Sequence, residues 1–249
     1  MKKTQVIILA AGMGKRMGGD VPKVLVEVSG KPMLGYVLEA VKNSGVDEKP
    51  IIVVGPKNHD LIRSFAGENF NYAMQAEQLG TGHAVAQARE HILPDTEKII
   101  VLYGDQPMMS AETIKNLAET HADSHLTMAT TTVEDFADWR AGFENFSRVI
   151  RDEVGNIIRT VEKKDASESE LSILEVNPCY MIFEKDFLFK NLENLSNNNA
   201  QGEYYLTDLI HQATSGGFKI KTISIDPREA LGANTIEQKE LIERILGEK

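Results

Sequence analysis

Two glycines and two cations near the N-terminus are the residues best suited to chemistry. Gly12 and Gly14 follow an unbroken apolar run at residues 6–11, and Arg16 and Lys23 come shortly after them. The run is too short for a typical helix and predicts a strand buried on both faces. Glycine lets the backbone turn sharply and approach a ligand closely. Arginine adds a planar fork of donors and lysine a compact charge. Together they predict a phosphate-binding loop at the carboxyl end of a strand.

Two familiar phosphate-binding motifs do not fit this loop. The P-loop requires Ser or Thr after Gly-Lys, but Arg16 occupies that position. The dinucleotide fingerprint requires a third glycine, where this chain has Met17. On these residues alone, a simple strand-to-helix turn is the competing interpretation.

Two oxygen-bearing side chains are candidate metal ligands. Asp105 directly follows the apolar run 99–103, and ligands of open α/β sheets bind at the carboxyl ends of strands. Mg²⁺ prefers one or two protein oxygens together with phosphate oxygens, so a carboxylate here suits it. Asp-x-Pro is also turn-like, and Asn234, just before the last predicted helix, can equally be a helix cap.

The segment from Gln75 to Val85 combines a side-chain amide with a glycine-rich helix start. An amide can pair with both a donor and an acceptor on a base edge. The first N–H groups of a helix beginning at residues 80–82 have no partner within the helix. The segment therefore suits recognition of a nucleobase, although a threonine-capped helix start accounts for it as well.

The elements that must position these residues alternate along the first half of the chain. Strands are predicted at residues 6–11, 24–28, 51–54, 71–75 and 99–103, and helices at 32–45, 60–65 and 80–92. Such alternation predicts right-handed βαβ units and a mostly parallel sheet. After about residue 124 the pattern becomes richer in strands, which are predicted at 126–133, 148–151, 157–161, 176–183 and 220–225. Helices are predicted at 186–195, 204–214 and 235–246, and an exposed loop at 162–172.

Composition limits the possible partners. With 249 residues, 42% of them apolar and 26% charged, the chain is an ordinary globular protein with room for one large α/β domain. A net charge of -10 disfavours nucleic acid and membrane surfaces as partners. Cys179 is the sole cysteine, and no signal-peptide core or run of 18 apolar residues occurs. We expect a cytoplasmic protein; a homo-oligomer is possible.

Residues 9–17 and 22–25 together resemble the signature of the sugar-phosphate nucleotidyltransferases. Over about residues 4 to 240 the sequence is most similar to the uridyltransferase (pyrophosphorylase) domain of the bacterial N-acetylglucosamine-1-phosphate uridyltransferases. The resemblance implies a Rossmann-like α/β fold with a smaller β-rich sugar-binding part. It also implies Mg²⁺ as cofactor, and UTP and N-acetylglucosamine-1-phosphate as substrates. We predict a single domain, with a nucleotide-binding part at about 1–124, a sugar-binding part at about 125–230, and a metal-ligand segment with the C-terminal helix at 231–249.

The resemblance also implies roles for individual residues. The nucleotide-binding residues are Leu9, Ala10, Ala11, Gly12, Gly14, Gln75, Gly80 and Thr81. Arg16 and Lys23 are catalytic, Asp105 and Asn234 hold the metal, and Tyr103, Glu162 and Asn177 bind the sugar. On residue type alone, Glu162 and Asn177 would be expected at the surface.

Two segments depart from the family pattern. Residues 145–148 are Asn-Phe-Ser-Arg in place of Gly-Tyr-Gly-Arg, and residues 177–179 are Asn-Pro-Cys in place of Asn-Thr/Ser-Gly. Both lie where the resemblance puts the sugar, so another hexose-1-phosphate is an alternative substrate. A catalytically silent regulatory subunit is a further alternative, although the presence of Arg16, Lys23, Asp105 and Asn234 argues against it. The bifunctional bacterial enzymes also carry a left-handed β-helix acetyltransferase domain. This sequence has no hexapeptide repeats, and we expect no acetyltransferase activity.

Overall fold

Strand β1 (Lys3–Leu9) lies at the centre of the first half of the sheet. The computed structural model describes residues 3–14 and 21–248. β1 pairs in parallel with β4 (Ile51–Val54) on one side and with β6 (Thr96–Tyr103) on the other, and β4 pairs in parallel with β5 (Asn71–Met74). Both faces of β1 are covered, which explains its continuous apolar run. The parallel arrangement predicted for this half is confirmed.

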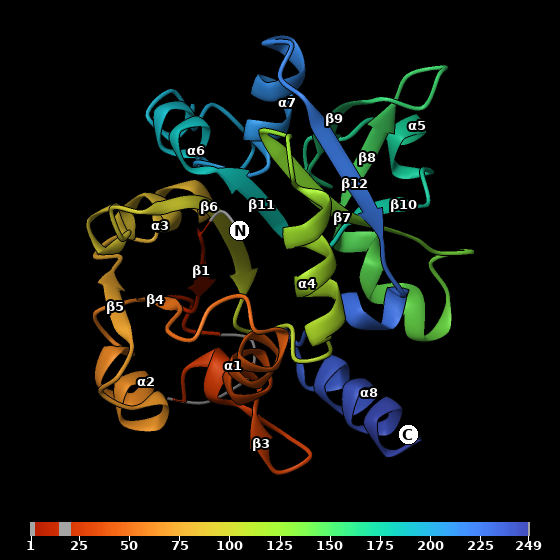
Figure 1. Ribbon diagram of the computed structural model, residues 1–249. Helices are drawn as coiled ribbons and strands as arrows, with labels where there is room; N and C mark the ends of the chain where they lie inside the picture. The colour runs from red at the N-terminus through yellow and green to blue at the C-terminus, as the bar shows by residue number, and fades with distance from the viewer. Residues whose placement is uncertain (1–2, 15–20, 249) are drawn as a thin grey trace.

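Strand β11 (Met181–Glu184) joins this parallel half to an antiparallel half. It pairs antiparallel with β6 and with β7 (Leu126–Thr132), so one sheet runs through both halves (Figure 1). Beyond β7 come β10 (Glu175–Asn177), β8 (Ser147–Arg151) and β9 (Ile157–Val161), all antiparallel. β12 (Ile220–Ser224) lies parallel to β7. The described residues thus form a sheet of ten strands in the order β5-β4-β1-β6-β11-β7-β10-β8-β9, with β12 beside β7.

Helices cover both faces of the sheet, and the alternation of side chains along β1 separates two cores. Val6 and Ile8 point to a core shared with α1 (Met33–Ser44), α4 (Ala111–Thr120) and α8 (Ile236–Gly247). Ile7 points to the opposite core, shared with α3 (Thr81–Gln87), α6 (Lys185–Leu192) and α7 (Asp208–Ser215). The remaining elements are α2 (His59–Ala66), the small hairpin β2 (Glu27–Val28) and β3 (Lys31–Pro32), and 3-10 helices at Lys23–Leu25, Arg89–His91, Asp138–Asn145 and Pro227–Ala230. Among the described helices, none is both long and apolar enough to cross a bilayer.

Several predicted elements were wrong in extent. The strand predicted at 176–183 is two strands, β10 and β11, because Pro178 lacks an N–H and Cys179 has φ +66° between them. The helix predicted at 186–195 ends at Leu192. The helix predicted at 204–214 begins at Asp208, because the backbone of Tyr204 is engaged elsewhere: it accepts from the Gly82 N–H and donates to the Leu79 carbonyl, both at 2.8 Å. The helix predicted at 80–92 ends at Gln87 and gives way to a 3-10 turn. The extended piece predicted at 24–28 begins as a 3-10 turn and becomes a strand at Glu27.

The predicted loop at 162–172 contains a short helix. α5 (Glu168–Leu171) begins at a capping box, in which Ser167 and Glu170 exchange side-chain to backbone hydrogen bonds. Such a box satisfies two N–H groups at a helix start. The sequence contains this Ser-x-x-Glu motif, which indicates a helix start. The polar composition of the stretch led to the prediction of a loop instead.

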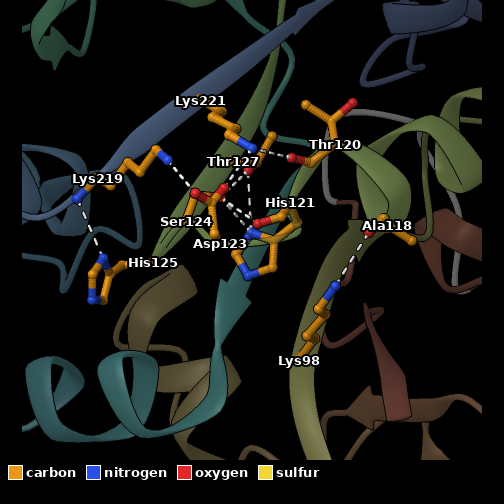
Figure 2. A network of polar contacts seen from close by, with 10 residues as sticks. All are labelled: Lys98, Ala118, Thr120, His121, Asp123, Ser124, His125, Thr127, Lys219 and Lys221. Atoms are coloured by element: carbon orange, nitrogen blue, oxygen red, sulfur yellow. Dashed lines mark hydrogen bonds and ion pairs between the residues drawn. The ribbon is translucent and has the colours of Figure 1, made fainter. Parts of the chain in front are cut away.

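A polar network ties the end of α4 to β7 and β12 (Figure 2). The buried His121 contacts the hydroxyls of Ser124 and Thr127 through Nδ1, both at 3.1 Å, and these hydroxyls lie 2.8 Å apart. At the rim, Lys221 Nζ lies 2.8 Å from an oxygen of Asp123. A buried group that keeps its hydrogen bonds avoids a desolvation penalty, so this network has a structural role.

Candidate active site

A cleft of about 1240 Å³ is lined by residues from both halves of the sheet. It reaches the carboxyl end of β6, where open α/β sheets place their ligands. Six of the predicted site residues are among those lining it: Lys23, Tyr103, Asp105, Glu162, Asn177 and Asn234. The cleft is large enough for a small-molecule substrate and a nucleotide.

Three residues far apart in the sequence meet at one end of this cleft. Lys23 Nζ forms an ion pair with Asp105 and donates a hydrogen bond to Asn234 Oδ1. Lys23 opens a 3-10 turn, Asp105 follows β6, and Asn234 lies two residues before α8. The Gln238 side chain accepts a hydrogen bond from the Asn234 N–H at 2.7 Å, which fixes the backbone just before α8. The side chains of Lys23 and Asp105 are each 16% exposed, so solvent screens their attraction only in part.

The donor set of Asp105 and Asn234 fits Mg²⁺. One carboxylate oxygen and one amide oxygen converge on a single cationic group, the Lys23 ammonium. Mg²⁺ takes oxygen ligands and is bound by one or two protein oxygens together with substrate phosphates. The two residues predicted as metal ligands therefore lie close enough together to share an ion.

The loop after β1 packs directly against Lys23. A Cβ added to Gly14 would lie 2.5 Å from Lys23 Cβ, so no larger residue fits there without moving the loop. Asn58, fully buried and not predicted as a site residue, anchors the same loop by donating to the Ala10 carbonyl at 2.9 Å. Arg16, the second predicted catalytic cation, lies outside the described residues.

The predicted base-binding segment is tied to the start of α3. Gln75 is buried and donates through Nε2 to the Gly80 carbonyl at 3.1 Å. Thr81 Oγ1 accepts from the Leu206 N–H at 3.0 Å. These bonds draw residues 75–81 and 204–206 into one unit, so the second half of the chain fixes the shape of the predicted nucleotide-binding turn.

Tyr103 connects that turn to the cleft. Its hydroxyl lies near the side chains of Thr81 and Cys179. Burial raises the pKa of Tyr103 well above its ordinary value, so the side chain stays a neutral phenol. Burial likewise raises the pKa of the Cys179 thiol. Cys179 has φ +66°, in the left-handed region that favours glycine.

The predicted sugar-binding residues face the cleft rather than the outer surface. Asn177 is only 1% exposed, and its Oδ1 accepts from the Cys179 N–H at 2.7 Å. Glu162 is partly buried and accepts from the Thr207 hydroxyl at 3.0 Å. Burial raises the pKa of Glu162, and the nearby carboxylate of Asp208 adds to the effect. Residue type alone predicts that both side chains lie at the outer surface. That prediction is wrong because both residues line the cleft between the two halves of the sheet.

Comparison with known proteins identifies the family. A model of the MobA-like NTP transferase domain matches residues 6–212. The chain belongs to this NTP transferase family. The resemblance to nucleotidyltransferases noted from the sequence is therefore confirmed.

Relatives of this NTP transferase include proteins named bifunctional protein GlmU. The one from Alcanivorax borkumensis is 44% identical over 241 residues, which is 96% of this chain and 51% of the relative. The one from Caldicellulosiruptor saccharolyticus is 37% identical over 94% of this chain and 50% of the relative. The chain thus spans about half the length of the curated relatives it matches.

A solved structure supports the fold. A 4-diphosphocytidyl-2C-methyl-D-erythritolsynthase from Anaerococcus prevotii superimposes with a TM-score of 0.69 over 99% of both chains, at 17% identity. At that identity the likeness concerns the fold alone. The predicted α/β fold class is confirmed.

Two buried polar residues of this NTP transferase's cleft, Gln106 and Ser147, were not predicted as site residues. Gln106 follows Asp105, is buried, and donates through Nε2 to the Pro178 carbonyl at 3.0 Å. Ser147 is buried and lies directly opposite Asn177 in the pairing of β8 with β10. Both residues could have been suspected from their positions in the sequence. Gln106 is adjacent to a predicted metal ligand, and Ser147 replaces a glycine of the family pattern.

Proposed function

We propose that this NTP transferase is a uridyltransferase that forms UDP-N-acetylglucosamine and pyrophosphate from UTP and N-acetylglucosamine-1-phosphate. The carrying observation is that Lys23, Asp105 and Asn234 meet in the cleft that Glu162 and Asn177 also line. The 44% identity to a relative named bifunctional protein GlmU supports the proposal. So does the resemblance of the glycine loop and of residues 75–85 to the uridyltransferase pattern.

The proposed reaction requires no protein nucleophile. A phosphate oxygen of the sugar-1-phosphate attacks the α-phosphorus of UTP in line and forms the new P–O bond. The bond from the α-phosphorus to the bridging oxygen breaks, and its electron pair leaves with pyrophosphate. Catalysis of such a transfer is mainly positioning and charge neutralisation. The backbone after β1 and Arg16 would hold the triphosphate, and Lys23 would neutralise phosphate oxygens near the reacting centre.

Asp105 and Asn234 are the residues that would hold Mg²⁺. When bound, the ion supplies positive charge to phosphate oxygens. The partly buried Asp105 carboxylate also pairs with the Lys23 side chain and directs it into the cleft. We therefore expect Asp105 to serve both the ion and the lysine.

Pyrophosphate release from UTP in the presence of Mg²⁺ tests the proposal. N-acetylglucosamine-1-phosphate, glucose-1-phosphate and galactose-1-phosphate are compared as acceptors. We expect release to be fastest with the acetamido sugar and to fall about a hundredfold in Asp105→Asn, the scale of one lost charge-stabilising group. Lys190→Ala, an exposed lysine on α6, is the matched control and should behave as the unaltered chain.

Another hexose-1-phosphate is a second candidate acceptor because three residues alter the predicted sugar site. Asn145, Ser147 and Cys179 add side chains where the family pattern has glycine. Preference for a plain hexose-1-phosphate would keep the mechanism and change the substrate. Release with none of the three sugars would favour a catalytically silent subunit.

A further inference from the structure

Three buried polar atoms on one wall of the cleft have no hydrogen-bond partner within the described part of the chain. They are Gln106 Oε1, Ser147 Oγ and Asn177 Nδ2. Two other buried side-chain atoms of the described residues also lack a hydrogen-bond partner, one on Thr160 and one on Gln212. Neither of these residues lines the cleft. Leaving a buried polar group unpaired costs about 1–3 kcal/mol. Three such groups on one wall indicate that the wall is built to pair with a ligand.

We call Gln106, Ser147 and Asn177 the polar wall. Neighbouring backbone groups decide which of its atoms can donate a hydrogen bond and which can accept one. Pro178 offers only a carbonyl, so Gln106 must turn its NH₂ group toward it, which leaves Oε1 as the unpaired atom. The Cys179 N–H can only donate, so Asn177 must turn its oxygen toward that group and present NH₂. The wall thus offers one acceptor, one donor, and a hydroxyl that can do either.

The three groups lie close together. Ser147 and Asn177 are direct partners in the pairing of β8 with β10, so their side chains stand on the same face with Cβ atoms about 5 Å apart. Gln106 is bonded to Pro178, the residue after Asn177. The three unpaired groups therefore belong to one small region of the cleft lining.

We propose that Gln106 and Ser147 are specificity-determining residues which, with Asn177, bind an uncharged face of the sugar-1-phosphate. This rests on the proposed uridyltransferase function. A hydroxyl or acetamido group can donate to Gln106 and accept from Asn177 at the same time, with Ser147 pairing to a neighbouring group. A carboxylate cannot donate to Gln106, and an ammonium cannot accept from Asn177. The wall therefore selects neutral sugars over uronic acids and free amino sugars.

Ser147→Ala gives the cleanest test, because the Ser147 hydroxyl bonds to nothing else in the described chain. We expect the midpoint of denaturant unfolding to stay the same or rise slightly. The kcat/KM for the sugar-1-phosphate should fall about tenfold, while the KM for UTP should not change. Thr160→Val is the matched control: it also removes an unpaired hydroxyl, but in β9 and outside the cleft lining, and it should leave both constants unchanged.

A panel of substrate analogues identifies the group that the wall reads. Each hydroxyl of the preferred sugar-1-phosphate is replaced singly by fluorine, which cannot donate a hydrogen bond. At one position we expect kcat/KM to fall about 10- to 100-fold in the unaltered chain and to show little further loss in Gln106→Met. If the acetamido group is the partner, the analogue with an O-acetyl group in its place, which cannot donate a hydrogen bond to Gln106, should show this coupling instead.

The outcomes separate this inference from the function on which it rests. Normal kcat/KM in Ser147→Ala, together with unchanged analogue discrimination in Gln106→Met, would overturn the inference and leave the uridyltransferase proposal intact. Absence of pyrophosphate release with every sugar-1-phosphate would overturn both.

Discussion

At the scale of the residue, Lys23 joins separate parts of the site. Its ammonium contacts Asp105 and Asn234, and its Cβ lies against Gly14. The residue therefore links the glycine loop to both predicted metal ligands. The chain has a net charge of -10, so an anionic substrate needs positive charge close to its binding site. Lys23 supplies such a charge.

We expect Lys23→Ala to lose about 3 kcal/mol of transition-state stabilisation, roughly a hundredfold in rate, the scale of one lost preorganised donor. The same loss is expected for Arg16→Ala. Steady-state pyrophosphate release measures both, with Lys190→Ala as the control. Near-normal turnover in both variants would refute their catalytic roles.

Glu162 predicts a stability that depends on pH. Burial raises its pKa in the folded chain above the unfolded value, so folding favours the protonated carboxyl. Stability from this group is fully present below the unfolded pKa and is lost as pH rises through the folded pKa. Glu162→Gln keeps the oxygen that accepts from Thr207 and removes the charge.

The Glu162→Gln variant should therefore have a Tm about 2 °C higher than the unaltered chain at pH 8, the scale of a 1 kcal/mol effect in a chain of this size. The difference should disappear below pH 4.5, the ordinary pKa of a glutamate carboxyl. Thermal melts at both pH values check this. A gap that widens on acidification would contradict a raised pKa.

At the scale of the element, the predicted base-binding turn depends on close approach between distant segments. Gly80 has φ +110°, and a Cβ there would lie 2.6 Å from the Tyr204 carbonyl oxygen and 2.7 Å from its nitrogen. Both are backbone atoms, so no side-chain rotation relieves the contact. The start of α3 and the segment before α7 must therefore hold each other in place.

Gly80→Ala should destabilise the chain by on the order of 3 kcal/mol, because it adds a steric clash to left-handed backbone strain. Gly155 is the matched control: it also has positive φ, at +89°, but nothing lies within 4 Å of its added Cβ. Gly155→Ala should cost only about 1 kcal/mol. Denaturant unfolding measures both, and equal losses would show that the contact with Tyr204 is unimportant.

At the scale of the whole molecule, one sheet and one shared core connect the two halves. β11 pairs with β6 of the first half and β7 of the second, and one core contains Val6, Ile182 and Ile245 together. Neither half can unfold without exposing apolar surface of the other.

We therefore predict a single calorimetric transition in which the van 't Hoff and calorimetric enthalpies agree. Differential scanning calorimetry of the full chain checks this, and UTP with Mg²⁺ should shift the whole transition upward. Two separable transitions would instead support an independent domain at about residues 125–230.

The sequence alone determined the features that depend on near neighbours. The unbroken apolar run predicted β1, and the pattern at residues 32–45 predicted α1. Strand propensity, helix caps and turns arise from interactions within a few residues, so they can be seen in the printed chain. The motifs at residues 9–25 and 75–85 likewise indicated the family without any coordinates.

Only the tertiary structure decided which distant groups meet. The contact of Lys23 with Asn234 spans 211 positions, and it depends on how β1, β6 and α8 come together rather than on any local preference. Asn177 is buried because β10 lies at the wall between the halves, although its type suggested exposure. The late start of α7 has the same cause, since Tyr204 pairs with a turn over a hundred positions earlier in the chain. Burial and long-range pairing follow from the order and register of the strands, which are properties of the whole sheet and not of any segment.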